Sequence, residues 1–235
     1  MTLYRLFADA PSGRHGLLNV LAFIVALISA LVLHEIAHGL VALWNGDPTA
    51  KQLGRLSLNP IRHFDWIGLI LMFLVGFGWA KPVPVNPNNF KNRKTGAITV
   101  SIAGVVTNVV LAFFAAMCYV LFEKITPKSE GVAYLTYFLQ VLALLMCRLN
   151  VTFALFNILP LYPLDGYRLL SSFVNENNGA MTFLRRYSLY IMLGFIILNS
   201  VSVISFVSPL YWYLSKFGGL IQEGFDNFWR LIFNA

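Results

Sequence analysis

Residues 17–44 read LLNVLAFIVALISALVLHEIAHGLVALW, an apolar run with a single cluster of ionisable side chains near its end. A helix needs about 20 predominantly apolar residues to cross the hydrocarbon core of a bilayer, and this run is longer. The composition agrees, because 58% of the 235 residues are hydrophobic and only 11% are charged. Soluble domains carry about 25% charged residues. The sequence therefore predicts an integral membrane protein built from helices.

Three further apolar runs have spanning length: Ala97–Phe122, Val132–Leu159 and about Tyr187–Val207. A fifth run, Trp66–Trp79, would cover only about 21 Å as a helix, less than a hydrocarbon core of about 30 Å. Irregular backbone at membrane depth is tolerated where it lies beside other protein, so we expect this run to be a re-entrant segment. The predicted fold is an all-α bundle of about four spans plus this segment.

The loop charges predict an orientation. Ten Lys and Arg residues fall on one side of the predicted bundle and six on the other. The richer side holds Lys51, Arg55, Arg62, Lys81, Lys91, Arg93, Lys94, Arg168, Arg185 and Arg186. Cytoplasmic loops carry the excess of Lys and Arg, so we expect a multi-pass protein of the plasma membrane with this side in the cytoplasm. The net charge of +7 lies in loops and not on one helical face, which indicates a lipid bilayer and no nucleic acid as partner.

We divide the chain into an N-terminal tail (1–16), a membrane-embedded core (17–207) and a C-terminal segment (208–235). In the last segment, apolar residues recur at helical spacing with polar residues between them, which predicts an amphipathic helix. Such a helix lies in the membrane interface or packs on the bundle. We assign it to the interface, and the second arrangement remains an alternative.

The ionisable cluster of the first run is HEIAH, residues 34–38. Residues four apart on a helix share a face and lie about 6 Å apart along the axis, so His34 and His38 can hold one metal ion. Glu35 can reach a water molecule on that ion and act as general base. Ionisable side chains at membrane depth are costly, and a bound metal offsets that cost.

A catalytic zinc ion takes three protein ligands and keeps one position open, so a third ligand is needed. Asp165 follows the third long run and is the only acidic residue within positions 131–175. Pro160 and Pro163 interrupt the helix before it and can turn the chain back toward the two histidines. Asp165 is the candidate third ligand, and we expect one Zn²⁺ ion per chain.

These motifs resemble those of the site-2 protease family, the zinc metalloproteases of intramembrane proteolysis. HEIAH matches the family's HExxH, and Asn157-Ile-Leu-Pro160 followed by Leu164-Asp165-Gly166 matches its NxxP…LDG. Ala103-Gly104 with Asn108 matches a further helix motif. GRLSLNP (54–60) and GWAKPVPVNP (78–87) resemble loops of the compact bacterial and archaeal members, which carry no PDZ or CBS domain.

The resemblance covers about residues 30–170 and implies cleavage of transmembrane segments of regulatory proteins. It also implies that Asn157 lies near the catalytic centre, where we cast it as a catalytic donor to the substrate carbonyl or the oxyanion. Asn108 is expected among the substrate-binding residues. Neither the identity of the substrate nor the oligomeric state follows from the sequence.

A transmembrane helix must unwind before water can attack it, and unwound backbone within a membrane needs new hydrogen-bond partners. Two segments can supply them: Arg55-Leu56-Ser57-Leu58, which alternates in period two, and Lys81–Val85, held extended by its prolines. We expect a small β element near the active site in which Arg55–Leu58 pairs with the substrate as an added strand. Two ordinary surface loops are the alternative.

Two other functions stay open. A catalytically silent membrane protein that only binds its partners would share the fold, although such a relative would be expected to have lost a ligand or the base. A metal-dependent transporter would explain Arg148, which lies in the middle of a predicted span. It would leave Glu35, beside a two-histidine motif, unexplained.

Overall fold

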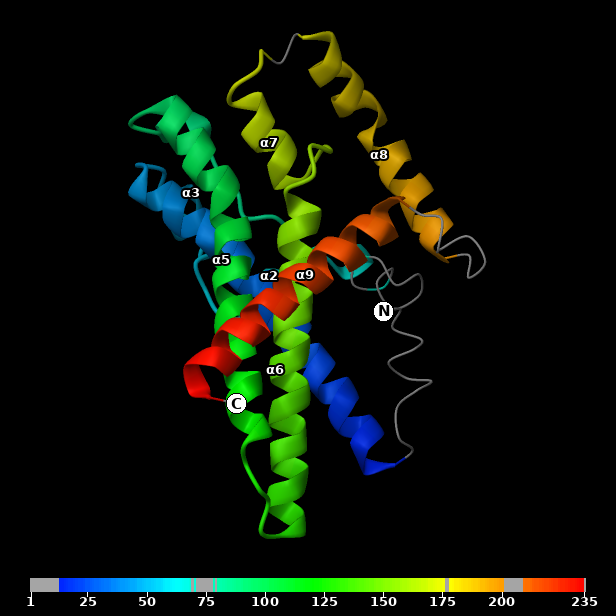
Figure 1. The fold of residues 1–235 in the computed structure, drawn as a ribbon. Coiled ribbons are helices and arrows are strands. Elements are labelled where there is room, and N and C mark those ends of the chain that lie inside the picture. Colours follow the sequence, from blue (N-terminus) through cyan, green and yellow to red (C-terminus); the bar gives the residue numbers. More distant parts are fainter. Residues whose placement is uncertain are drawn as a thin grey trace.

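The computed structural model describes residues 13–68, 70, 78, 80–175, 178–200 and 209–234, apart from the side chains of residues 196–200. Over these residues the protein is mostly helical (Figure 1). The helices are α2 (Arg14–Trp44), α3 (Thr49–Gln52), α5 (Arg93–Glu123), α6 (Glu130–Asn157), α7 (Asp165–Ser171), α8 (Gly179–Ser200) and α9 (Pro209–Phe233), with short 3₁₀ turns η1 (Pro60–Arg62) and η2 (Pro87–Asn89).

Three helices, α2, α5 and α6, are each long and apolar enough to cross a membrane. They pack against one another, and α5 runs antiparallel to α6 (Figure 1). The side chains of Asn92 and Ser129 cap α5 and α6 by accepting hydrogen bonds from the main-chain N–H groups of Thr95 and Val132. Three of the four predicted spans are therefore helices of spanning length.

Small side chains line the contacts between these helices. Ala112, Ala115 and Ala116 of α5 are buried in a cluster with residues of α6. Ala22 and Ala26 of α2 are buried in a second cluster with α6. Small residues let helix backbones approach closely, which is how helices gain packing energy within a membrane.

The fourth predicted span, about Tyr187–Val207, begins within α8, but its last part lies outside the described residues. Most of the predicted re-entrant run, Trp66–Trp79, also lies outside them. The count of about four spans and the re-entrant segment therefore stay predictions.

The described part of the chain contains no sheet, so the small β element expected near the active site is not confirmed. In the segment 55–58, Leu56 and Leu58 lie at bends, and an isolated antiparallel bridge joins Phe64 to Ala80. The chain after this bridge forms no ladder, because Pro82 and Pro84 lack the N–H groups that a ladder needs.

Helix α9 packs on α5 and α6 and crosses both of them (Figure 1). Phe225 and Trp229 contact the α5–α6 cluster, and the indole N–H of Trp229 donates to the Phe113 carbonyl at 2.9 Å. Arg230 forms an ion pair with Glu123 at the end of α5. In the structure, α9 thus packs on the bundle, as the alternative arrangement expected. Its position in the membrane interface stays a prediction.

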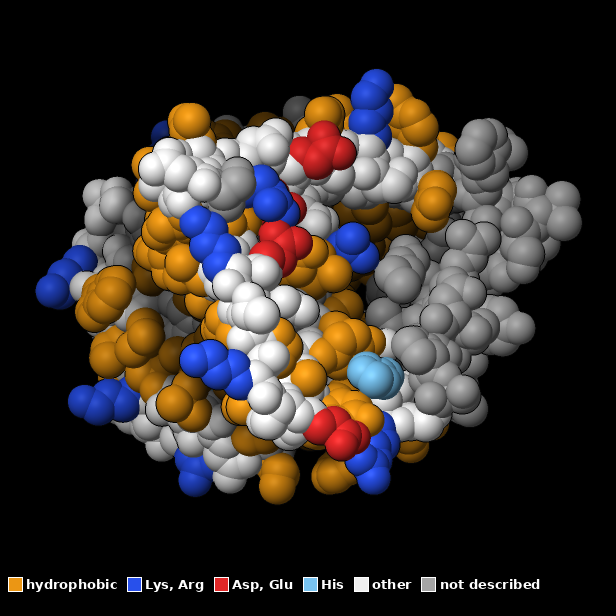
Figure 2. Space-filling view, turned by 60° about the horizontal axis from the view of Figure 1, so that its bottom comes forward, with side chains coloured by type: hydrophobic (Ala, Val, Ile, Leu, Met, Phe, Trp, Pro, Cys, Tyr) orange, Lys and Arg blue, Asp and Glu red, His pale blue; other side chains and the backbone are white. Residues whose placement is uncertain are grey.

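The outer surface of the bundle is rich in apolar side chains. Figure 2, which brings the lower end of the bundle forward, shows hydrophobic side chains over much of this face with scattered charges between them. Exposed large residues of α2 and α5 include Ile24, Val25, Val106, Val110 and Phe114. Contiguous apolar surface of this kind suits helices that face lipid.

Candidate metal centre

The two histidines of HEIAH lie on one face of α2, as their spacing of four residues requires. Their Nε2 atoms are 3.1 Å apart, and the side chains of His34 and His38 are 8% and 4% exposed. His38 lies six positions before Trp44, where α2 ends, so the pair sits about 9–15 Å inside that end of the helix.

Asp165 reaches this pair because it begins α7, just after the chain turns back from the end of α6. Its Oδ2 atom lies 3.2 Å from Nε2 of His34 and 3.1 Å from Nε2 of His38. The close turn depends on Gly166, where a Cβ atom would lie 2.1 Å from the Ile158 carbonyl oxygen. Among the described residues, these three side chains are the group that could hold a metal ion.

Helix α5 supports both imidazoles from the other side. His38 Nδ1 donates to the Val100 carbonyl at 2.7 Å, and His34 Nδ1 lies 3.3 Å from Asn108 Oδ1. Gly104 lets α5 approach this closely, since a Cβ there would lie 2.4 Å from Cε1 of His34 and 2.5 Å from Nε2 of His38. Asn108, expected in the substrate-binding set, is fully buried and contacts a histidine.

These hydrogen bonds leave three lone pairs facing one another. The Val100 carbonyl can only accept, so His38 carries its proton on Nδ1, and donation to Asn108 gives His34 the same tautomer. The approach of the two Nε2 atoms is then not a hydrogen bond. Oδ2 of Asp165 has no hydrogen-bond partner among the described residues.

A cation fits between these atoms. Ligand atoms held about 2.0–2.1 Å from a tetrahedral ion lie about 3.3 Å from one another. The three measured separations, 3.1, 3.1 and 3.2 Å, are close to this value. Two neutral imidazole nitrogens and one carboxylate oxygen are also a donor set of catalytic zinc sites.

Glu35, the candidate general base, follows His34 on α2 and is half-buried. Its Oε2 atom accepts a hydrogen bond of 2.7 Å from the main-chain N–H of Val83. This contact was not predicted from the sequence. The available signal was the pair Pro82 and Pro84, which leaves Val83 the only N–H donor of the three.

Asn157, cast as a donor to the substrate, is the last residue of α6. Its side-chain amide donates to the Phe153 carbonyl in the preceding turn at 3.1 Å. Its proposed role therefore requires that this amide turn toward a substrate, and the role stays a prediction.

The segment Arg55–Leu58 contacts the rest of the protein on one side and is open on the other. Arg55 is 9% exposed and donates through Nη2 to the Lys81 carbonyl at 2.7 Å. The Ser57 carbonyl is 2.8 Å from Nε2 of His63, which is itself buried. Leu58 is 73% exposed. The structure therefore attaches this segment to the chain beside Glu35, and its role in substrate binding stays a prediction.

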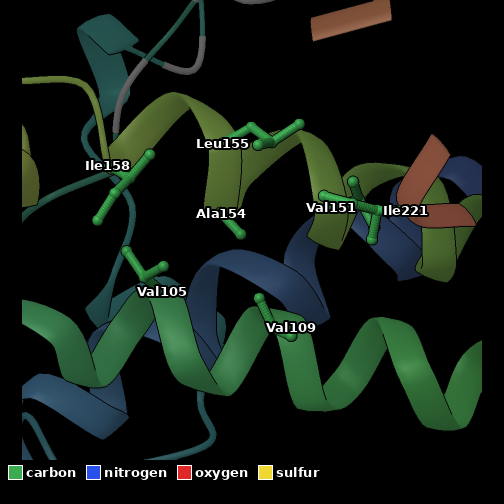
Figure 3. A pocket seen from close by; sticks show the side chains of 7 residues that line it. All are labelled: Val105, Val109, Val151, Ala154, Leu155, Ile158 and Ile221. Carbon is green, nitrogen blue, oxygen red and sulfur yellow. The ribbon is translucent and has the colours of Figure 1, made fainter. Parts of the chain in front are cut away.

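A small apolar pocket of about 130 Å³ lies between α5 and α6 (Figure 3). Val105 and Val109 of α5 point across it toward Ala154 and Ile158 of α6, and Ile221 of α9 lies at one end. These α5 positions follow Gly104 and Asn108 by one residue. The pocket is therefore on the neighbouring face of the helix that supports the histidines.

Comparison with known proteins finds similar chains. The chain is 41% identical over 209 residues to a Bacillus subtilis protein named "Putative zinc metalloprotease YwhC". The aligned residues make up 88% of this chain and 89% of the Bacillus protein. Two proteins named "Putative zinc metalloprotease Rip2" are more distant. The Mycolicibacterium smegmatis protein is 26% identical over 83% of this chain and 73% of its own length. The Mycobacterium tuberculosis protein is 29% identical over 72% and 64%. No family model and no solved structure matches.

Proposed function

The chain belongs to the site-2 protease family of zinc metalloproteases, and from this premise we propose that it hydrolyses peptide bonds in or near transmembrane helices of membrane-anchored proteins. Zn²⁺ is its cofactor. The observation that carries the proposal is that Asp165 converges on His34 and His38 of α2, a helix long and apolar enough to cross a membrane, with Glu35 on the same helix. The small apolar pocket between α5 and α6, on the neighbouring face of α5, has room for an apolar side chain of a substrate.

The residues of the chain have distinct parts in this reaction. When bound, the zinc ion lowers the pKa of its water to about 7 and polarises the scissile carbonyl. Glu35 takes the proton of the attacking water on Oε1, since Oε2 holds the Val83 N–H, and returns it to the leaving amine. Asn157 donates to the developing oxyanion after its amide leaves the Phe153 carbonyl.

We also propose that the substrate, once unwound, pairs with the main chain of Arg55–Leu58. Leu58→Pro is the cleaner test, because Leu58 is exposed whereas the side chain of Leu56 packs over Gly39. Leu58→Ala keeps the N–H and is its control. Loss of cleavage in Leu58→Pro alone, restored on a substrate already weakened by helix-breaking residues, would support pairing; wild-type rates in both variants would exclude it.

The orientation is part of the proposal. The end of the bundle that carries Asp165 and the segment Lys81–Val85 is the end rich in loop Lys and Arg, which supports an active site toward the cytoplasm in a multi-pass plasma-membrane protein. The transporter alternative drew on Arg148. This residue donates to Gln222 of α9 at 3.3 Å, so a structural contact accounts for a charge in the middle of a predicted span.

The deciding experiment uses detergent-purified protein and a model transmembrane substrate. We expect cleavage that a zinc chelator abolishes and added Zn²⁺ restores. Glu35→Gln should keep about one zinc ion per chain and lose cleavage by about 10²–10⁴-fold, the usual contribution of a general base. Wild-type cleavage by Glu35→Gln would refute the mechanism, and a metal-loaded wild-type chain that cuts no substrate would favour the silent binding protein.

A further inference from the structure

The main chain over Lys81–Asn86 (KPVPVN) runs beside α2 and is fastened at both ends; we call it the KPVPVN segment. At its start, the N–H of Lys81 donates to the His63 carbonyl at 2.9 Å, and the Lys81 carbonyl accepts from Arg55 at 2.7 Å. At its end, the N–H of Asn86 donates to Oδ2 of Asp47 at 2.7 Å. Two polar anchors therefore set the position of the chain between them.

Asp47 connects the second anchor to the helix that bears the active-site motif. It is fully buried, and its own N–H donates to the Ala42 carbonyl of α2 at 2.9 Å. Its Oδ1 atom accepts from the Thr49 N–H at 3.1 Å and from Nδ2 of Asn89 at 2.8 Å. A carboxylate with this many donors is held firmly, so the end of the KPVPVN segment moves with α2.

Between the anchors, the segment makes one polar contact with the catalytic motif. The N–H of Val83 donates to Oε2 of Glu35 at 2.7 Å, a short distance typical of a charge-assisted hydrogen bond. Pro82 and Pro84 have no N–H, so no neighbouring donor can replace it. The Val83 side chain is 5% exposed and lies over Gly39, one helical turn beyond Glu35, which fixes the depth of the N–H.

We propose that the main-chain N–H of Val83 is a positioning group for Glu35. It holds Oε2 in one place and thereby turns Oε1 toward the reacting water, while Asp47 and Arg55 keep the segment in register. This inference rests on the proposed proteolytic function and deepens it. The role is one of orientation: Val83 touches neither substrate nor metal ion, and acts on the reaction through the carboxylate it binds.

Orientation of a general base affects the chemical step more than substrate binding. The basic oxygen must lie within about 2.6–3.2 Å of the oxygen or nitrogen atom whose proton it removes. A misplacement of about 1 Å can lower the rate about 100-fold. Loss of the Val83 donor should therefore lower kcat by about 10–100-fold and leave KM and metal content within about twofold.

The kinetic test compares two substitutions at one position. Val83→Pro removes the N–H and keeps an extended backbone, because the residue already precedes Pro84. Val83→Ala keeps the N–H and removes the side chain that packs on α2. We expect low kcat with bound zinc and unchanged KM in Val83→Pro, and a clearly higher kcat in Val83→Ala, which loses the packing side chain but keeps the N–H. Equal kcat in the two variants, or a higher kcat in Val83→Pro, would overturn the proposal.

A second measurement does not depend on activity. Hydrogen exchange of a fragment covering residues 81–85 reports three amides, those of Lys81, Val83 and Val85, since the prolines have none. In full-length protein, Glu35→Ala should release one additional amide to fast exchange, and Glu35→Gln, which keeps an acceptor oxygen, should not. Unchanged exchange in Glu35→Ala, or release of the Lys81 amide as well, would overturn the proposal. A wild-type chain without proteolytic activity would refute the proposed function, and the exchange result would still decide the Val83–Glu35 contact.

Discussion

The substitution Gly104→Ala, which adds one methyl group, should strongly lower the affinity of the metal centre for zinc. Gly104→Ala adds a Cβ atom 2.4 Å from Cε1 of His34 and 2.5 Å from Nε2 of His38, whereas carbon atoms in contact lie about 3.5–4.0 Å apart. At least one ring, or α5 itself, must therefore move by about 1 Å. Ligand distances in metal sites tolerate about ±0.2 Å. The displacement is several times that tolerance.

The expected effect is on zinc affinity and not on helix formation. Loss of groups that merely orient metal ligands typically costs 10–100-fold in affinity, and a displaced ligand should cost at least as much. Alanine in the interior of a helix is favoured over glycine by about 0.5–1 kcal/mol, so helix propensity acts in the opposite direction. A loss of zinc would thus come from the contact with the imidazoles.

The assay is competition for zinc between purified protein and a chelator of known affinity, with cleavage measured in parallel. Gly131→Ala is the matched control, because a Cβ in this first turn of α6 meets nothing within 4 Å. It should bind zinc as the wild type does. Gly104→Ala with wild-type zinc affinity would refute the assignment of the site, since the added methyl could not coexist with both ligands.

Three further predictions follow from the same structure. Asp165→Asn should lower zinc affinity at least 10–100-fold, because a neutral amide is a poorer ligand, and tight zinc binding by this variant would exclude Asp165 as a ligand. Burial raises the pKa of Asp47, but hydrogen bonds, foremost from Thr49, outweigh it and hold the pKa below its usual value. The stability from Asp47 should therefore be complete above about pH 4 and be lost as the pH falls through the lowered pKa, and Asp47→Asn should remove this part of the pH dependence of unfolding. A cysteine that replaces the exposed Lys91 should react with an impermeant thiol reagent only after the cells are opened. A cysteine that replaces the exposed Lys128 should react in intact cells as well. The reverse pattern of labelling would overturn the proposed orientation.

The sequence predicted the long helices and the histidine pair because both depend on local patterns, whereas Asp165 was indicated by the shortage of other acidic residues nearby and by the prolines before it. The long apolar runs became α2, α5 and α6, since length and apolarity alone decide whether a segment can span a membrane. The spacing in HEIAH and the prolines before Asp165 indicated three side chains that could converge, and the structure brings their ligand atoms within 4.8 Å of one another.

The contacts that support this centre could not be predicted in the same way. Val83 and Glu35 are 48 positions apart, and Asn108 and His34 are 74 apart. No periodicity along the chain connects residues at such separations. The small β element is not confirmed in the described residues, and for residues 81–85 there is a physical reason: the prolines that keep this segment extended also remove the donors that a ladder requires.

The convergence on the metal centre also links zinc occupancy to the stability of the whole chain. His38 and Asp165 are separated by 126 residues (165 − 38 − 1), and the ion binds only a conformation in which α2 and α7 meet. Mass action then adds the free energy of zinc binding to that of unfolding, by about 1.4 kcal/mol for each tenfold excess of free zinc over its dissociation constant. The midpoint of thermal unfolding becomes a function of the zinc concentration. Zinc thus acts on this protein as a reversible cross-link between the first long helix and the segment after the third, in addition to its part in hydrolysis.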